Sequence, residues 1–221
     1  GSAWTPPPPL PEREYYQDHL PVRDQGEIKG HAVRAMYLTT GMADVVLEKT
    51  DEAMEAALHR LWDNTYSRKA YVTGALGSRY EGEAFGDNYE LPNERAYAET
   101  CAAIGSIFWN WRMLLRYGEA KYADAIETAL YNSMLSGISL DGQGYFYMNP
   151  LASRGGYARD TWFECSCCPP NVARLLMSLP GYAYSKSKDG LWVHMYVKGS
   201  VSVDISEASN FSLDIDTDYP W

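Results

Sequence analysis

The chain has 221 residues, of which 46% are hydrophobic and 22% are charged, so it is long enough to bury a sizeable core. Its net charge of −10, without any dense run of Lys or Arg, excludes non-specific binding to nucleic acid. No apolar stretch approaches the roughly 20 residues that cross a bilayer, and the N-terminal residues lack the order of a secretory signal. We therefore expect a globular, cytoplasmic protein that binds neither nucleic acid nor membranes.

The N-terminal segment, residues 1–25, is predicted to be an extended strap or linker. Its sequence "TPPPPLP" favours a polyproline conformation, because each proline lacks an amide donor and biases the preceding residue away from helical dihedral angles. The first helix is expected only after this segment.

From about residue 30 the hydrophobic pattern predicts helices. Apolar residues recur at three-to-four spacing over residues 31–49 and 51–66, which indicates two consecutive antiparallel helices. Two further helices are expected over residues 101–118 and 121–138, with Gly118 and Gly137 as their C-terminal stops. A fifth helix is expected over residues 171–187.

Two other stretches depart from this pattern. Residues 72–97 form a glycine-rich segment that is too long for a plain connection, and loops of this length usually carry function or lack order. Over residues 191–205 and 211–221 the hydrophobic period changes to two, which predicts strands. Because a sheet of two or three strands is marginal by itself, we expect the natural chain to continue beyond Trp221.

Three of the four cysteines lie in the sequence "CSCCPPN", which raises the question of disulfide bonds. The adjacent Cys167 and Cys168 cannot pair without strain, and Cys165 is poorly placed for Cys167. One relaxed bridge from this segment to Cys101 stays open. The crowded spacing does not resemble the spread framework of a small secreted disulfide-rich domain.

A metal site fits the same cysteines better. Zinc takes thiolates and a carboxylate in tetrahedral geometry, and Glu99 and Cys101 in "AETC" form the distant pair that would complete a site with Cys167 and Cys168. Residues two apart diverge on a helix, so a helix is predicted to begin at about Thr100. Two prolines likewise place Cys167 and Cys168 at a helix start.

That placement has a chemical consequence, because a helix N-terminus and bound zinc both favour thiolate over thiol. One sulfur could be an activated nucleophile. A closed site, in which zinc only braces two loops, is the commoner arrangement for thiolate-rich sites, and the residues leave both interpretations open.

Several other polar residues are candidates for the same site. His31 stands at the start of a predicted helix, and a glycine-rich loop carries Glu81, Glu83 and Asp87, where a carboxyl group with a raised pKa could act as an acid catalyst. A structural histidine and a solvated acidic loop are the ordinary interpretations. Tyr145 and Tyr147 alternate in "YFYMNPL" and are equally compatible with a plain strand or turn.

Taken together, the motifs "GEAFGDNYELPN", "AYAETCAAIG", "YFYMNPL" and "CSCCPPNVARLL", preceded by "GHAVRAMYL", resemble glycoside hydrolase family 127. The order and spacing match over roughly residues 10 to 220. The family is typified by retaining β-L-arabinofuranosidases with an (α/α)6-barrel catalytic domain followed by β-sandwich domains. The resemblance thus implies a mainly α chain, with residues 26–188 as part of the barrel and residues 189–221 as the start of a sandwich.

The resemblance also implies a role for each candidate residue. Zn²⁺ would be bound by Glu99, Cys101, Cys167 and Cys168, and Cys167 would double as the nucleophile. Glu83 would be the general acid/base, His31 would contact the sugar, and Tyr147 or Tyr145 would lie beside the nucleophile. Cys165 would be a neighbour outside the metal shell. The substrate would be an arabinofuranose-containing oligosaccharide or glycoconjugate.

The chain departs from the family pattern in two respects. An (α/α)6 barrel needs about a dozen helices and only five are predicted, so the first half of the barrel and two of its sugar-binding histidines have no counterpart. A second copy of the chain or the remainder of a longer chain would have to complete the site. A catalytically silent carbohydrate-binding module with a structural zinc is the alternative, and clustered thiols argue against a histidine-based sugar epimerase.

Overall fold

The computed structural model describes residues 11–206 and 209–219, and the predicted polyproline segment falls largely outside them. The chain divides into two compact units, Gly1–Val172 and Ala173–Trp221, and each is described by itself. The N-terminal unit is helical, and the C-terminal unit contains two β-hairpins. The chain is thus mainly helical with a small β part, as the sequence predicts.

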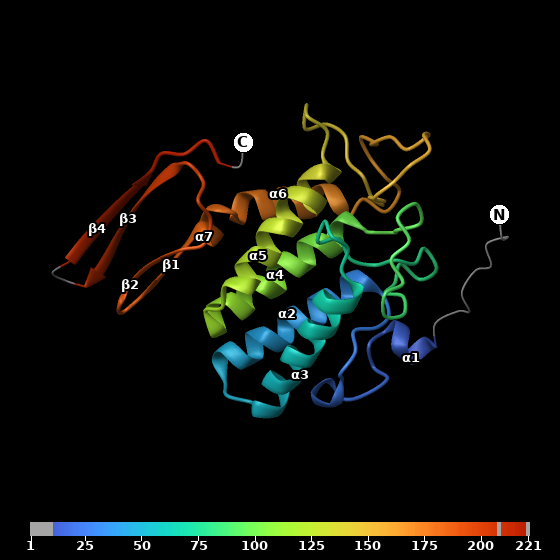
Figure 1. The fold of residues 1–221 in the computed structure, drawn as a ribbon, viewed down its shortest axis with the longest axis horizontal. Coiled ribbons are helices and arrows are strands. Elements are labelled where there is room, and N and C mark those ends of the chain that lie inside the picture. The colour runs from blue at the N-terminus through green and yellow to red at the C-terminus, as the bar shows by residue number, and fades with distance from the viewer. Residues whose placement is uncertain (1–10, 207–208, 220–221) are drawn as a thin grey trace. The chain divides into compact units, whose positions relative to one another are not determined.

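The helices of the first unit follow one another along the chain with two irregular continuations. They are α1 (Glu12–Tyr15), η1 (Val22–Asp24), α2 (Ala32–Glu48), α3 (Glu52–Asn64) with the π-helical η2 (Thr65–Lys69), α4 (Thr100–Tyr117), α5 (Ala120–Ala129) with the π-helical η3 (Leu130–Met134), and η4 (Leu135–Gly137). Helix α6 (Cys168–Ser178) begins at the end of this unit. Figure 1 shows α2 to α5 as a layer of roughly aligned helices.

Local sequence explains where these helices begin and end. Asp51 caps α3 by accepting a hydrogen bond from the Met54 amide at 3.0 Å, which satisfies one of the free donors at the helix start. Gly118 ends α4 in the left-handed conformation, and its amide donates to the Leu114 carbonyl at 2.8 Å. The start of α4 at Thr100 and its stop at Gly118 confirm the predictions from sequence.

Helices α2 and α4 make the closest contact in the helical layer, and a glycine permits it. A Cβ atom on Gly105 would lie only 2.8 Å from the Cβ of Met36 on α2. Ile104, Ile107 and Trp109 of α4 are fully buried around this crossing. The two helices whose N-termini carry His31 and Glu99 are therefore held at a fixed spacing by tight packing.

Two predictions about this unit need correction. The segment expected to be an extended strap contains the short helices α1 and η1 within its described part. The helix expected over residues 121–138 is regular only to Ala129, and then passes through η3 and η4 before it ends at Gly137. Gly137 lies against the start of α4, where an added Cβ would meet Thr100 Oγ1 at 2.9 Å.

The long loops, residues 70–99 and 138–167, gather at the end of the helical layer where α2 and α4 begin (Figure 1). Isolated bridges join His31 to Ala84 and Glu99 to Met148, and the Ala98 amide donates to the Gly77 carbonyl at 2.7 Å. These backbone contacts link segments far apart in sequence. They assemble the candidate residues at one end of the layer.

The second unit contains the short helix α7 (Pro180–Ala183) and four strands. β1 (Tyr184–Ser187) pairs antiparallel with β2 (Gly190–Val193), and β3 (Gly199–Ser206) pairs antiparallel with β4 (Ser209–Ile215). The fifth helix was expected to reach residue 187, but Pro180 cannot continue the hydrogen bonding of α6, and residues 184–187 form a hairpin closed at Gly190 instead.

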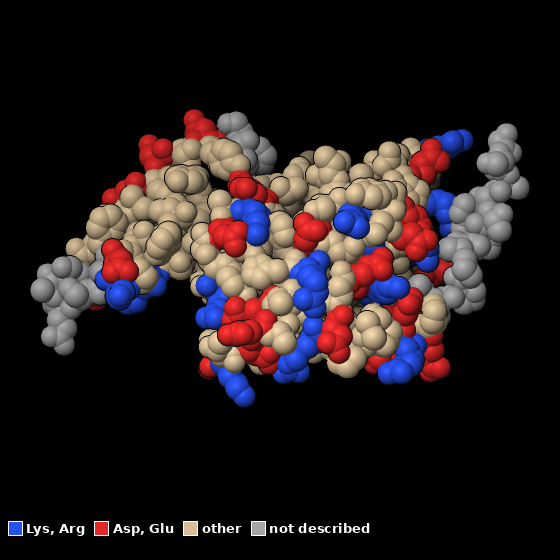
Figure 2. All heavy atoms as spheres, turned by 60° about the horizontal axis from the view of Figure 1, so that its bottom comes forward, with Lys and Arg blue, Asp and Glu red and all other residues tan. Residues whose placement is uncertain are grey.

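Charges of both signs are mixed on the face of the molecule that Figure 2 shows. Figure 2 shows Lys and Arg side chains lying among Asp and Glu side chains on the face in view. Ion pairs join Arg112 to Asp44 at 2.8 Å and Arg23 to Asp51 at 2.6 Å. Within the described residues, none of the helices is both long enough and apolar enough to span a bilayer.

Candidate metal centre and active site

The first part of the site is built at the N-terminus of α4. Glu99 precedes the helix with extended dihedral angles, and Cys101 lies in its first turn. The Thr100 amide donates to the Tyr147 carbonyl at 3.0 Å, and its hydroxyl donates to the Phe146 carbonyl at 2.7 Å. The change from extended to helical backbone at Thr100 lets the side chains of Glu99 and Cys101 converge, as the sequence predicts.

The second part comes from the start of α6, where Cys168 is the first helical residue and Cys167 precedes it. The Cys101 and Cys168 sulfurs are 3.6 Å apart, those of Cys167 and Cys168 are 3.8 Å apart, and Cys167 Sγ lies 3.4 Å from Glu99 Oε1. One ligand atom from each of these four residues lies within 4.8 Å of every other. All four cysteines of the chain are free thiols, so the bridge to Cys101 that stayed open is not formed.

The four residues fit a tetrahedral metal ion. Zinc–sulfur bonds of ~2.3 Å in tetrahedral geometry place two sulfurs ~3.8 Å apart, close to the observed separations. Glu99, Cys101 and Cys168 are buried, and the Oε2 atom of Glu99 has no hydrogen-bond partner. A buried carboxylate oxygen without a partner is costly unless a cation or another donor binds it. The donor set of three thiols and one carboxylate can therefore hold a metal ion.

Cys167 differs from the other three residues of the cluster in the direction of its pKa shift. Hydrogen bonds within the cluster lower the pKa of Cys167, first from Cys101 and then from Cys168, and they raise the pKa of Cys168. Burial, followed by the charge on Cys167, raises the pKa of Glu99 to about 9. Burial and the hydrogen bonds of the cluster thus favour the thiolate form of Cys167 over the carboxylate form of Glu99.

Glu83 stands opposite the cluster on a tight turn. The backbones of Arg79 and Ala84 pair at 3.0 and 3.1 Å, which closes a loop in which Gly82 and Glu83 both have positive φ, 74° and 51°. A left-handed conformation is unfavourable for glutamate, and such strain concentrates at functional sites. The Glu83 carbonyl also accepts a hydrogen bond from the Ala32 amide at 2.9 Å, which fixes the turn to the start of α2.

His31 connects this turn to the cluster. Its Nε2 atom lies 3.1 Å from Glu83 Oε2, and one ligand atom from each of His31, Glu83 and Glu99 falls within 4.8 Å of the other two. Burial lowers the pKa of His31 although the Glu83 charge opposes that effect, so the imidazole is neutral near pH 7. The Nδ1 atom is buried without a partner and is available to a ligand hydroxyl.

Tyr147 lies at the cluster, and Tyr145 does not. Burial raises the pKa of the Tyr147 hydroxyl, and hydrogen bonding with this hydroxyl lowers the pKa of Cys167. The Tyr145 hydroxyl instead donates to the Gly142 carbonyl at 3.1 Å within its own loop. Cys165 is exposed and belongs to neither ligand group, although its carbonyl accepts the Cys167 amide at 2.9 Å.

Tyr97 is a residue of this site that the sequence analysis missed. Its ring packs edge-on against Tyr147 at 6.1 Å and Tyr80 at 5.1 Å, and burial followed by the Glu83 charge raises the pKa of its hydroxyl. Its only sequence signal was its position two residues before Glu99; the left-handed Ala98 between them, with a φ of 45°, breaks the alternation of an extended chain.

Comparison with known proteins identifies related sequences and structures. Residues 3–181 match the family model described as "Beta-L-arabinofuranosidase, GH127 catalytic domain". The chain is 37% identical over 220 residues to a non-reducing end beta-L-arabinofuranosidase of Bifidobacterium longum subsp. longum. It resembles the solved structures of a GH127 beta-arabinofuranosidase (TM-score 0.91, 48% identity) and of a GH127 beta-L-arabinofuranosidase from Geobacillus stearothermophilus T6 (TM-score 0.90, 42% identity).

These matches cover 94% of this chain in each case but only 33%, 33% and 34% of the three relatives, respectively. The chain therefore spans about a third of the length of the proteins that it matches.

Proposed function

The chain belongs to glycoside hydrolase family 127, and from that premise we propose that it carries the catalytic centre of a retaining glycosidase that cleaves β-L-arabinofuranosides or closely related furanosides. In this proposal α2 to α6 are part of an (α/α)6 barrel within residues 26–188, and the strands after residue 188 begin a β-sandwich. The similarity to structures of GH127 enzymes supports this arrangement.

One observation carries the proposal: Cys167 is the accessible member of a buried ligand set. Glu99, Cys101 and Cys168 are buried, whereas Cys167 is half-buried and has a lowered pKa. A site that only braces two loops has no need for a thiolate within reach of solvent, because a structural zinc site is closed. A nucleophile must be both ionised and reachable, and Cys167 meets both conditions.

Glu99, Cys101, Cys167 and Cys168 would hold Zn²⁺ in the active protein. The ion would supply a positive charge that keeps the four ligands deprotonated and makes the Cys167 sulfur a better leaving group. The spacing of the sulfurs and the unpartnered oxygen of Glu99 support this assignment.

The residues of the chain divide the reaction into two displacements. In the first, the Cys167 thiolate attacks the anomeric carbon, the glycosidic C–O bond breaks, and Glu83 gives its proton to the departing oxygen. In the second, Glu83 takes a proton from water, which attacks the same carbon and releases Cys167 as thiolate. Two inversions retain the configuration at the anomeric carbon.

The surrounding side chains position the sugar for these steps. His31 is neutral and has a free Nδ1 atom, so it can hydrogen-bond a ring hydroxyl while its Nε2 atom orients the Glu83 carboxyl group. Tyr147 stabilises the thiolate by hydrogen bonding. Tyr97 packs against Tyr147 and lies near Glu83, which keeps both catalytic groups in place.

Hydrolysis of an aryl β-L-arabinofuranoside by the zinc-loaded protein tests the proposal. Cys167→Ser replaces the sulfur by a poor nucleophile and should abolish turnover while the far-UV circular dichroism stays unchanged. Cys165→Ser is the matched control in the same segment and should retain wild-type turnover. Turnover by Cys167→Ser close to that of the wild type would eliminate the proposed mechanism.

A further inference from the structure

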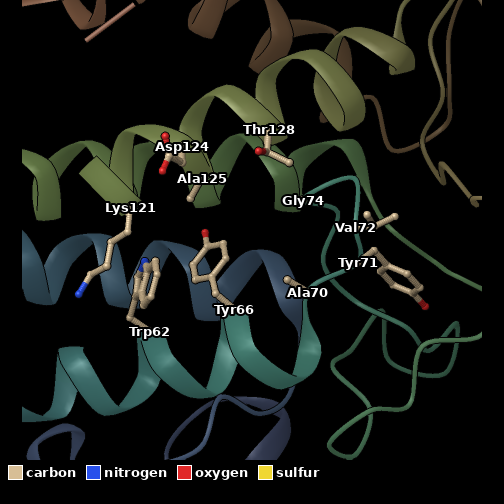
Figure 3. A pocket seen from close by; sticks show the side chains of 10 residues that line it. All are labelled: Trp62, Tyr66, Ala70, Tyr71, Val72, Gly74, Lys121, Asp124, Ala125 and Thr128. Carbon is tan, nitrogen blue, oxygen red and sulfur yellow. The ribbon is translucent and has the colours of Figure 1, made fainter. Parts of the chain in front are cut away.

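A second site lies on the helical layer away from the cysteine cluster. A groove of about 330 Å³ runs between α3 with its continuation η2 on one side and α5 on the other (Figure 3). In the close-up view, Trp62 and Tyr66 project from the first side toward α5. A volume of this size falls at the lower end of the range for small-molecule pockets.

The aromatic wall of the groove, Trp62 and Tyr66, is held in place by hydrogen bonds to α4. Trp62 and Tyr66 are one helical turn apart, and their rings lie 4.7 Å apart with an interplanar angle of 30°. The Trp62 Nε1 atom donates to Asn110 Oδ1 at 2.8 Å, and the amide nitrogen of Asn110 donates to the Tyr66 hydroxyl. Asn110 is fully buried in α4. The polar atoms of both rings are thus satisfied internally, and the ring edges that line the groove are held in place before a ligand binds.

The opposite wall is polar and has unused hydrogen-bonding groups. Lys121, Asp124, Ala125 and Thr128 recur at three-to-four spacing along α5, so they share one side of the helix. Among the described residues, the Asp124 carboxylate and the Thr128 hydroxyl make no hydrogen bond or ion pair with the protein. The small side chain of Ala125 leaves the space above Tyr66 open (Figure 3).

A tight turn closes one end of the groove. The Gly74 amide donates to the Tyr71 carbonyl at 2.8 Å, and Gly74 has a φ of 77°. A Cβ on Gly74 would lie 2.9 Å from the backbone of Ala129, so the turn is pressed against α5. Val72 at its tip is 88% exposed, which places an apolar rim beside the polar wall.

The charges of the groove exclude two ligand classes. The Lys121 ammonium lies over the Trp62 ring, 5.0 Å from its centroid, and would repel a cationic ligand. The Asp124 carboxylate and the net charge of −10 oppose an anionic ligand. We propose that this groove binds one or two units of a neutral glycan, whose C–H groups contact the edges of Trp62 and Tyr66 that line the groove and whose hydroxyl groups bind Asp124 and Thr128.

The groove is distinct from the candidate active site. Asn110, which lies beneath the aromatic wall, is nine residues along α4 from Cys101, or about 14 Å along the helix axis. Hydrolysis at Cys167 and binding in the groove therefore use different residues. The inference goes beyond the proposed function and does not depend on it.

Affinity electrophoresis of the 221-residue protein through gels containing soluble arabinan tests the inference. The wild-type protein should be retarded by arabinan and not by the anionic polymer polygalacturonate. Ala125→Trp fills the groove with an indole ring and should weaken the binding by at least about tenfold. Asp124→Ala removes the carboxylate from an exposed position and should also weaken it, whereas Glu48→Ala removes the same charge from the exposed end of α2 and should not.

Three outcomes of this experiment would overturn the inference. Absence of retardation by arabinan, stronger retardation by polygalacturonate, or wild-type retardation of Asp124→Ala would each contradict it. If circular dichroism shows that Ala125→Trp does not fold, the comparison of Asp124→Ala with its control Glu48→Ala tests the inference. Cys167→Ser should be retarded like the wild type. Loss of its retardation would assign binding to the cluster, whereas residual hydrolysis by Cys167→Ser would contradict only the proposed function.

Discussion

At the scale of single residues, position decides the chemistry of similar side chains. Cys165, Cys167 and Cys168 differ by at most three positions, yet the first is exposed outside the cluster, the second is half-buried with a lowered pKa, and the third is buried with a raised pKa. Glu81 and Glu83 are only two positions apart and likewise have different partners. Glu81 lies 3.3 Å from Arg95, whereas Glu83 lies 3.1 Å from His31 in a strained turn.

Glu83→Gln tests the assigned acid/base role. The amide keeps the shape of the side chain but cannot deliver a proton, so hydrolysis of substrates with a poor leaving group should fall by about 10²–10⁴-fold. The rate of the first displacement should fall much less for a dinitrophenyl glycoside, because its leaving group departs without a proton. Steady-state and burst kinetics with the two substrate types measure the difference.

Nuclear magnetic resonance can measure the pKa of His31 in the same variant, independently of its kinetics. The Glu83 charge raises the pKa of His31 against the effect of burial, so the pKa of His31 should fall further in Glu83→Gln. Glu81→Gln is the matched control and should leave both kinetics and the His31 titration unchanged. Equal loss with both leaving groups would contradict the acid/base role of Glu83.

At the scale of the elements, sequence patterns located the helices because their signals are local. The extended residue before Thr100, the glycine at position 118 and the apolar spacing of α2 and α3 all act within a few residues. The pattern failed at β1, where Pro180 ends the helical hydrogen bonding of α6 and a hairpin with β2 forms in place of further helix. The π-helical segment η3 carries no local signal that marks it.

The candidate site was only partly predictable for the same reason. Spacing indicated the four candidate metal ligands, because thiolates and a carboxylate on two short segments are a common ligand set for zinc. The contacts of Tyr97 with Tyr80 and Tyr147, and the choice of Tyr147 over Tyr145, depend on how two long loops fold against each other. Sequence reasoning has no measure of that packing.

Gly105→Ala tests the close contact between α2 and α4. Alanine favours helix by about 1 kcal/mol, but its Cβ would lie 2.8 Å from the Met36 Cβ, so overpacking should destabilise the protein by about 1–3 kcal/mol. Gly41→Ala is the control, because its Cβ meets nothing within 4 Å, and it should stabilise α2 by about 0.5–1 kcal/mol. Denaturant unfolding measures both; stabilisation by Gly105→Ala would show that the crossing is loose.

At the scale of the whole molecule, metal binding should couple stability to pH. The pKa values of Cys101 and Cys168 are raised and that of Glu99 is raised to about 9, so these three groups are protonated near pH 7 without metal and must lose their protons to bind it. Cys167 is already ionised. Zinc affinity should therefore rise with pH from about pH 6 to pH 9 and continue to rise above it, because the two thiols still hold their protons there, by about tenfold per pH unit for each proton released.

Calorimetry in buffers of different ionisation enthalpy counts the released protons, and thermal unfolding measures the stabilisation. A zinc concentration 1,000 times the dissociation constant should stabilise the protein by about 4 kcal/mol, and a chelator should reverse the effect. Cys101→Ser should lose this response, whereas Cys165→Ser should retain it. Zinc affinity that does not change with pH would contradict the proton assignments.

The central claim is that the sulfur of Cys167 forms a bond to the anomeric carbon, and peptide mass spectrometry after rapid quenching tests it most directly. The zinc-loaded Glu83→Gln variant, incubated with a dinitrophenyl β-L-arabinofuranoside, should complete the first displacement and be slow in the second. The account predicts a pentosyl adduct on the peptide that contains Cys167, localised to Cys167 by fragmentation and absent from Cys167→Ser. An adduct on another residue would contradict the account. Release of dinitrophenol by Cys167→Ser at the same rate as by the protein without this substitution would also contradict it.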